Sequence, residues 1–292
     1  PVFSLSPISS SALIVIGSVT AIGTSLMAVA QIDVKRALSH STSAYLGLVF
    51  IAVGLGQIDI AFLLLFTHAI GKALLFMSAG SIILTTSNQN ITEMGGLGSR
   101  MPATTTAFVV GAASIVAFLP MGVFGTIQRW FDGSWQTGWW LLGILLFVNA
   151  LSALNFTRVF RLVFLGQPQM KTKRAPEVPW QMALPMVSLT VVALLTSIAP
   201  SNWSLWLSYT TPLNNSEELI SRIAVPLLIA SGAIGCLVGF FLELRRAWAR
   251  PTQFYLRFFQ DLFAYDFYVE KLYNVTVVWL VTNLSQAAAW FD

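Results

Sequence analysis

Apolar residues run through the chain in long blocks, and short polar segments separate the blocks. Seven such blocks can be drawn, over residues 8–30, 41–56, 58–84, 104–128, 137–164, 177–199 and 220–244. A helix needs about 20 apolar residues to cross the hydrocarbon core of a bilayer, and the blocks are close to that length. The pattern predicts an all-α protein, a polytopic membrane helix bundle.

The C-terminal part of the chain has a different pattern. Beyond residue 250, aromatic, charged and apolar residues are mixed, as in a helix that lies at a membrane surface. Residues 252–263 carry an apolar stripe at helical spacing. Residues 275–281 are apolar enough to leave an eighth span open.

Composition agrees with a membrane protein. Of the 292 residues, 56% are hydrophobic and 10% are charged, whereas a soluble domain has about a quarter charged residues. The lipid bilayer is therefore a predicted partner. The net charge of +4 comes without a basic run interleaved with aromatics, so no nucleic-acid partner is predicted. A single cysteine, Cys236, excludes an intrachain disulfide and a cysteine-based metal cluster, and no metal or cofactor site is predicted.

Basic residues alternate between the loops and give a topology. The loops after the first, third, fifth and seventh blocks carry Lys35, Arg36, Arg100, Arg158, Arg161, Lys171, Lys173, Arg174, Arg245, Arg246 and Arg250. The opposite loops carry Asp59, Asp132, Glu217 and Glu218, with Arg129 and Arg222. The positive-inside rule then places the basic loops on the cytoplasmic or stromal side. Tryptophans near the other side are assigned to an aromatic belt: Trp130, Trp135, Trp139, Trp140, Trp203 and Trp206.

Two ionisable residues stand in the middle of an apolar block. His68 and Lys72 are one helical turn apart and share a face. Placing a lysine at mid-membrane costs on the order of several kcal/mol unless the lysine is paired, hydrated or neutral. Because of this cost, an ionisable residue inside a membrane is interpreted first as functional. Both residue types can exchange a proton near neutral pH. The pair indicates a proton path. The alternative is structural, with His68 bonded to a neighbouring backbone and Lys72 paired with an acid elsewhere.

The fourth block contains Leu119-Pro120, followed by Gly122. Proline interrupts helical hydrogen bonding, and broken helices in membranes are tolerated beside protein or a water-filled cavity. A kink used for packing is the alternative. Arg129 follows the break and lies either at the surface or toward the cavity. Lys35 belongs to a basic loop, which is either ordinary or the cytoplasmic mouth of the path.

Several motifs resemble one family. Residues 31–39 (QIDVKRALS) resemble the D-x-K-R-x-L-(A/S) loop of the antiporter-like subunits of respiratory complex I. Residues 67–76 (THAIGKALLF) resemble that family's T-H-A-x-x-K-A-L-L-F helix, and residues 90–97 the loop after it. The subunit 5 branch is the most similar, because residues 264–273 resemble the start of its long lateral helix.

The resemblance implies a division of the chain. Residues 1–165 would be the second five-helix inverted repeat, 166–250 two further transmembrane helices, and 251–292 the start of a lateral amphipathic helix. The chain, which begins at Pro1, would be part of a longer protein.

The resemblance also implies a function. It is that of a proton-translocating subunit of a NAD(P)H/ferredoxin–plastoquinone oxidoreductase in the cyanobacterial thylakoid membrane. The chain would perform no redox chemistry, bind no cofactor and pack against other membrane-arm subunits. Lys72 would be the central protonation site, His68 its relay, and Lys35 a cytoplasmic-side site.

Three positions depart from the family pattern. Leu64 replaces a second histidine, and residues 41–45 (STSAY) replace S-T-M-S-Q. Arg129 stands where the family has an exit-side lysine, and arginine cannot relay a proton. This last change implies a CO₂-uptake form with a hydrophilic CO₂-hydrating partner. Two alternatives remain: an Mrp-type cation/proton antiporter subunit, and a non-pumping scaffold that docks the CO₂-hydrating partner.

Overall fold

The computed structural model describes residues 6–133, 139–170, 172–196, 218–241, 262–263 and 265–291. Within this part the regular elements are helices, joined by one isolated antiparallel bridge between Asp33 and Asn90. The chain divides into two compact units, Pro1–Glu243 and Leu244–Asp292.

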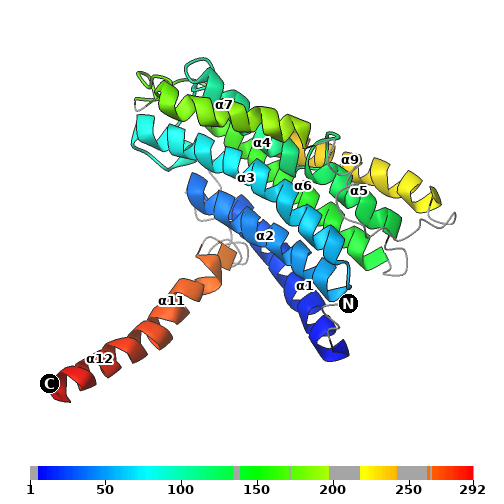
Figure 1. The fold of residues 1–292 in the computed structure, drawn as a ribbon. Coiled ribbons are helices and arrows are strands. Elements are labelled where there is room, and N and C mark those ends of the chain that lie inside the picture. The colour runs from blue at the N-terminus through cyan, green and yellow to red at the C-terminus, as the bar shows by residue number, and fades with distance from the viewer. Residues whose placement is uncertain are drawn as a thin grey trace. The chain divides into compact units, whose positions relative to one another are not determined.

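The first unit is a helix bundle (Figure 1). Its helices are α1 (Pro7–Ala30), α2 (Val34–Gly54), α3 (Ile58–Thr86), α4 (Pro102–Ile115), α5 (Val123–Gly133), α6 (Trp139–Val163), α7 (Trp180–Leu195) and α9 (Glu218–Phe241), with a 3-10 turn at Ile91–Glu93. The main packing pairs are α1 with α2, α3 with α4, and α6 with α9. α1, α2, α3, α6 and α9 are long and apolar enough to cross a membrane, and α4 and α7 are shorter apolar helices. The predicted all-α membrane bundle is confirmed.

α2 begins earlier than the apolar pattern predicted. Asp33 is its N-cap, and the carboxylate accepts hydrogen bonds from the backbone amides of Lys35 and Arg36, at 2.8 and 3.0 Å. A capping carboxylate satisfies amides that the first turn leaves without partners. The segment predicted as a basic loop is therefore the first turn of a helix, and the prediction of a loop at Lys35 was wrong.

The fourth apolar block forms a broken helix, as predicted. α4 ends at Ile115 and α5 begins at Val123. Pro120 has no amide to donate, and Gly122 adopts the left-handed region with φ +49°. A Cβ on Gly122 would also collide with the carbonyl oxygen of Ser114, so both the conformation and the space require glycine there.

Glycines bring neighbouring helices into close contact. Gly17 of α1 and Gly47 of α2 face each other, and a Cβ on either would lie 2.6 Å from the carbonyl oxygen of the other. Gly71 of α3 and Gly111 of α4 also face each other. Small residues at such crossings allow backbones to approach, and dispersion contacts then hold helices together in lipid.

The loop that precedes α7 is tied to the start of α4. The Glu177 carboxylate accepts hydrogen bonds from the amide of Ala103 at 2.8 Å, and from the amide and hydroxyl of Thr104 at 3.4 and 2.7 Å. α4 has Met101 in the N-cap position without a side-chain cap bond. Glu177 therefore caps α4 from 73 to 74 residues away in the sequence.

Replacing Glu177 with Ala is expected to lower the free energy of unfolding by about 1–2 kcal/mol, the usual cost of losing a helix cap. Thermal unfolding of the detergent-solubilised protein measures this loss. Glu177→Gln keeps an oxygen acceptor and should recover part of it. Equal stability of Glu177→Ala and the unmodified protein would show that water replaces the carboxylate at no cost.

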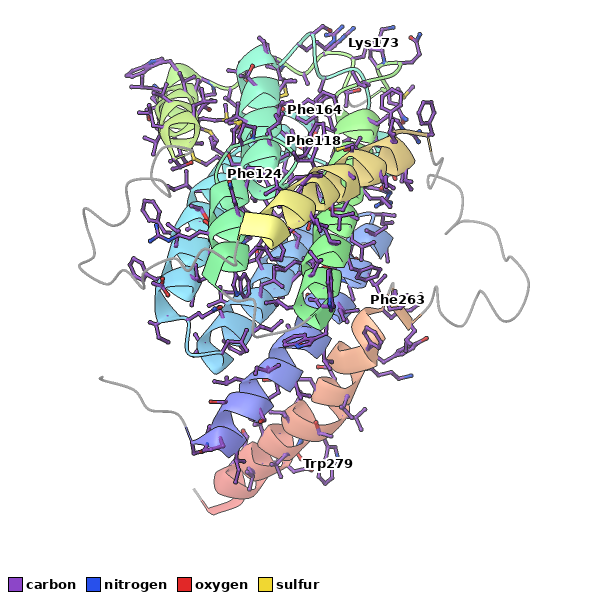
Figure 2. All side chains as sticks on the ribbon, turned by 90° about the vertical axis from the view of Figure 1, so that its right-hand side faces the viewer. Phe118, Phe124, Phe164, Lys173, Phe263 and Trp279 are labelled. Carbon is purple, nitrogen blue, oxygen red and sulfur yellow. The ribbon has the colours of Figure 1, made fainter. Side chains whose placement is uncertain are left out.

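The second unit contains a 3-10 turn (Asp266–Tyr268), α11 (Val269–Tyr273), a π-helical turn (Asn274–Val278) and α12 (Trp279–Phe291). Its large apolar side chains are exposed, among them Leu272 and Leu284. Trp279, labelled in Figure 2, is exposed as well. Residues 252–261, most of the predicted apolar stripe, lie outside the described part. The lateral helix and the threefold division of the chain therefore stay predictions.

Trp130 is fully buried in the bundle, so the prediction that it belongs to an aromatic belt was wrong. Trp130 lies on the inner face of α5 and is therefore surrounded by protein. The clustering of tryptophans in the sequence does not show which face of a helix each of them occupies. Trp139 and Trp140 are exposed, at 63% and 42%. Trp135, Trp203 and Trp206 lie outside the described residues.

Candidate functional site

Lys72 and His68 lie on α3, near the middle of its 29 residues. Both side chains are buried, with exposed fractions of 5% and 4%. α3 packs against α2, α4, α5 and α7, so the pair is enclosed by protein. The sequence prediction that these two residues share one buried face is consistent with this position.

The Lys72 ammonium contacts α2 and α6. It donates hydrogen bonds to the backbone carbonyl of Leu38, at 3.0 Å, and to the hydroxyl of Ser41. It also lies 5.3 Å from the ring centroid of Phe156, within cation–π range. Among the described residues, the partners found for Lys72 are all neutral. Lys72 can therefore lose its proton without leaving a buried carboxylate unpaired.

His68 is held by a ring contact. Its imidazole stacks on the Tyr45 ring of α2, with centroids 4.6 Å apart and planes inclined by 22°. Neither imidazole nitrogen has a hydrogen-bond partner in the described part of the chain. The backbone bond that the structural alternative requires is therefore not found there. Both nitrogens are available to accept or donate a proton.

A second helix approaches the site beside His68. The hydroxyl of Thr67 lies 3.4 Å from the hydroxyl of Thr126 on α5, and both residues are fully buried. Arg129 is three residues further along α5, close to one helical turn, and is half-buried. α5 thus connects the surroundings of His68 to the position of Arg129.

Lys35 lies apart from this group. It is exposed in the first turn of α2, six residues before Ser41, which corresponds to about 9 Å along the helix. The structure therefore brings His68 and Lys72 together with Ser41 and Tyr45, and places Lys35 at the end of α2.

Arg158 was assigned to a cytoplasmic loop, and this prediction was wrong. It lies on α6 and is fully buried. One of its nitrogens donates to the carbonyls of Val29 and Gln31, at 2.8 and 2.9 Å, where α1 ends. Carbonyls at a helix C-terminus lack intrahelical partners and attract cations. The signal was present, since residue 158 falls inside the apolar block 137–164.

Asn149 on α6 was also missed. Its oxygen accepts from the amide of Ala117 at 2.8 Å, just beyond the end of α4. Its nitrogen donates to the carbonyl of Leu228 at 3.1 Å and to the hydroxyl of Ser231 at 2.9 Å, both on α9. Asn149 is one of two asparagines in the apolar block 137–164, and this was the available signal, because a buried amide must find partners.

These features define an integral membrane helix bundle with a broken helix and a buried lysine–histidine pair. No cluster of three His, Cys, Asp or Glu side chains suited to a metal ion occurs in the residues that the structure describes.

Residues 1–155 match the family described as NADH:quinone oxidoreductase/Mrp antiporter, transmembrane. The chain belongs to this family, as the sequence motifs indicated.

Curated relatives include subunit 5 proteins. The chain is 46% identical over 292 residues to NAD(P)H-quinone oxidoreductase subunit 5, organellar chromatophore 2, of Paulinella chromatophora, covering 100% of this chain and 46% of that protein. It is 27% identical to the chloroplastic subunit 5 of Mesostigma viride, covering 100% of this chain and 48% of that protein. It is 37% identical over 161 residues to NADH-ubiquinone oxidoreductase chain 5 of Felis catus, covering 54% and 26%. The chain thus spans about half the length, or less, of these relatives.

Solved structures share the fold. A chain of the Mrp complex from Dietzia sp. DQ12-45-1b superposes with a TM-score of 0.60 at 18% identity, covering 80% of this chain and 50% of that chain. A chain of the membrane-bound sulfane sulfur reductase, an archaeal respiratory membrane complex, gives a TM-score of 0.59 at 20% identity, covering 77% and 44%. At these identities the likeness extends to the fold alone.

Proposed function

We propose that this chain carries protons across the membrane as part of an antiporter-like subunit of a photosynthetic, complex I-like NAD(P)H/ferredoxin–plastoquinone oxidoreductase. The observation that carries the proposal is a buried lysine with neutral partners, one turn from a buried histidine whose nitrogens have no partner in the described residues. Lys72 is the central protonation site and His68 the relay. Lys35 is a cytoplasmic-side site, and Arg129 a fixed positive charge at the exit side.

The redox chemistry belongs to other subunits, and this chain transmits its effect as proton movement. The names of the chromatophore and chloroplast relatives support a NAD(P)H-quinone oxidoreductase and a photosynthetic membrane. The proposed partners are the other subunits of the membrane arm, and the proposed location is a cyanobacterial thylakoid membrane.

Arg129 supports a finer proposal, a CO₂-uptake form of the complex. An arginine stays charged and raises the cost of placing a second positive charge nearby. Protons reaching α5 are then redirected instead of being released. In a complex with a hydrophilic CO₂-hydrating subunit, withdrawing protons from the hydration site would drive CO₂ toward bicarbonate.

Arg129→Lys in the intact complex tests this form. CO₂ uptake should fall by about tenfold while proton pumping holds or rises, since lysine restores a group that can relay a proton. Both activities are measured on the same membranes. Unchanged values for both would mean that Arg129 does not redirect protons, and would favour the ordinary pumping subunit.

The Mrp-type antiporter subunit is the second candidate, favoured by the family match and by the fold shared with the Mrp complex. The two functions differ in their driving force. Proton movement that depends on quinone reduction supports the oxidoreductase subunit. Proton movement that a Na⁺ gradient drives without electron transfer supports the antiporter.

A further inference from the structure

Tyr45 contacts two parts of the molecule that the sequence does not connect. Its side chain is 1% exposed on α2. Its ring stacks on His68 of α3. Its hydroxyl donates a hydrogen bond of 2.6 Å to the carbonyl of Ile115, the last residue of α4. One side chain thus joins the proposed relay to the break between α4 and α5.

The Ile115 carbonyl needs this donor. Where a membrane helix is interrupted, backbone groups lose their helical partners, and each costs several kcal/mol if left unpaired, about the cost of burying a bare amide. Two side chains supply partners at this break: Tyr45 for the carbonyl of Ile115, and Asn149 for the amide of Ala117. Asn149 is anchored on α9, whereas Tyr45 is anchored on His68 of α3 and also forms a hydrogen bond with Ser152 of α6.

The same isoleucine also touches α3. A Cβ on Gly71 would lie 2.8 Å from Cγ1 of Ile115, so the backbone between His68 and Lys72 packs directly on that side chain. Ile115 is therefore held through its carbonyl by Tyr45 and through its side chain by Gly71. A rotation of the His68 ring reaches the break through Tyr45, and a shift of α3 also reaches it through Gly71.

We propose that Tyr45 is a positioning residue that couples His68 to the α4–α5 break. Its ring sets the plane of the imidazole, and its hydroxyl holds the end of α4, so the two move together. Through α5 the coupling extends to Thr126 and Arg129, the segment proposed to control the far half of the path. This inference rests on the proposed function of His68 as a proton relay.

A double-mutant cycle in the intact complex tests the coupling. Tyr45→Phe keeps the ring on His68 and removes the hydroxyl, and should lower proton translocation about fivefold at unchanged assembly. In a His68→Gln background the same change should lower it no further. Ser114→Ala is the matched control, because it removes a buried hydroxyl that bonds to Val110 within its own helix, and it should leave translocation unchanged.

The outcomes separate the two proposals. Losses that multiply in the double variant would show that the Tyr45 hydroxyl acts independently of His68, and a full rate in Tyr45→Phe would show that the hydroxyl is not needed. Either result would overturn the coupling. A full rate in His68→Gln would remove the relay and the coupling with it.

If His68→Gln abolishes translocation, the double variant cannot show a further loss, and amide hydrogen exchange then tests the coupling. The amides of residues 115–119 and 121–123 should exchange faster in Tyr45→Phe and in His68→Gln, and at the original rate in Ser114→Ala. Unchanged exchange in Tyr45→Phe would overturn the coupling.

Discussion

Lys72→Met is expected to lower proton translocation at least about tenfold while the complex assembles normally. Methionine matches the length of the lysine stem and can pack on Phe156, but it has no group that carries a proton. The bonds to the Leu38 carbonyl and the Ser41 hydroxyl are lost. Because the partners of Lys72 are neutral, the substitution leaves no buried carboxylate without its counter-charge, and the fold should survive.

Proton uptake by inverted membrane vesicles, normalised to the amount of assembled complex, measures this effect. Lys173→Met is the matched control, because Lys173 is exposed on the loop beyond α6 (Figure 2). The control should translocate protons at the original rate. Normal translocation by Lys72→Met in an intact complex would favour the scaffold alternative, in which the chain docks a partner and moves no protons.

Gly47→Val should prevent the protein from accumulating in the membrane. A Cβ at this position would lie 2.6 Å from the carbonyl oxygen of Gly17 and 2.7 Å from the amide nitrogen of Ala21. Both contacts are with backbone, so α1 and α2 must separate to admit the side chain. Overpacking of this kind costs about 3 kcal/mol or more, a large fraction of the stability of a protein.

Gly23→Val controls for the intrinsic effect of valine in a helix. It lies on α1 as well, and a Cβ there has no atom within 4 Å. The yield of folded protein and its thermal midpoint should stay near the original values in Gly23→Val and collapse in Gly47→Val. Similar behaviour of the two variants would mean that helix propensity, and not the contact between α1 and α2, decides the outcome.

The elements could be predicted from sequence because their signals are local. Lipid-facing helices need long apolar runs, and a proline followed by glycines interrupts one of them at residues 116–122. His68 and Lys72 were found because an ionisable residue in an apolar run is conspicuous. The start of α2 was misplaced because the capping carboxylate of Asp33 matters more there than hydropathy does.

Contacts between helices could not be predicted in the same way. Tyr45 appeared in the sequence only as a departure from a motif, and its stacking on His68 depends on how α2 and α3 are rotated about their axes. Phe156 and Asn149 belong to an apolar block whose inward face cannot be recognised by periodicity, since both faces are apolar. Arg158 was misassigned because the positive-inside rule counts every basic residue near the end of an apolar block. That count does not distinguish a side chain that faces water from one that is buried in protein.

The cap that Glu177 provides has a consequence for shortening the chain. A fragment that stops at residue 165 retains the segment matched by the family, 1–155, yet removes the acceptor for the amides of Ala103 and Thr104. It also removes α9, whose Leu228 carbonyl and Ser231 hydroxyl anchor Asn149. A piece that keeps these bonds and the whole of α9 extends to Phe241, well beyond the segment 1–155 that the family matches.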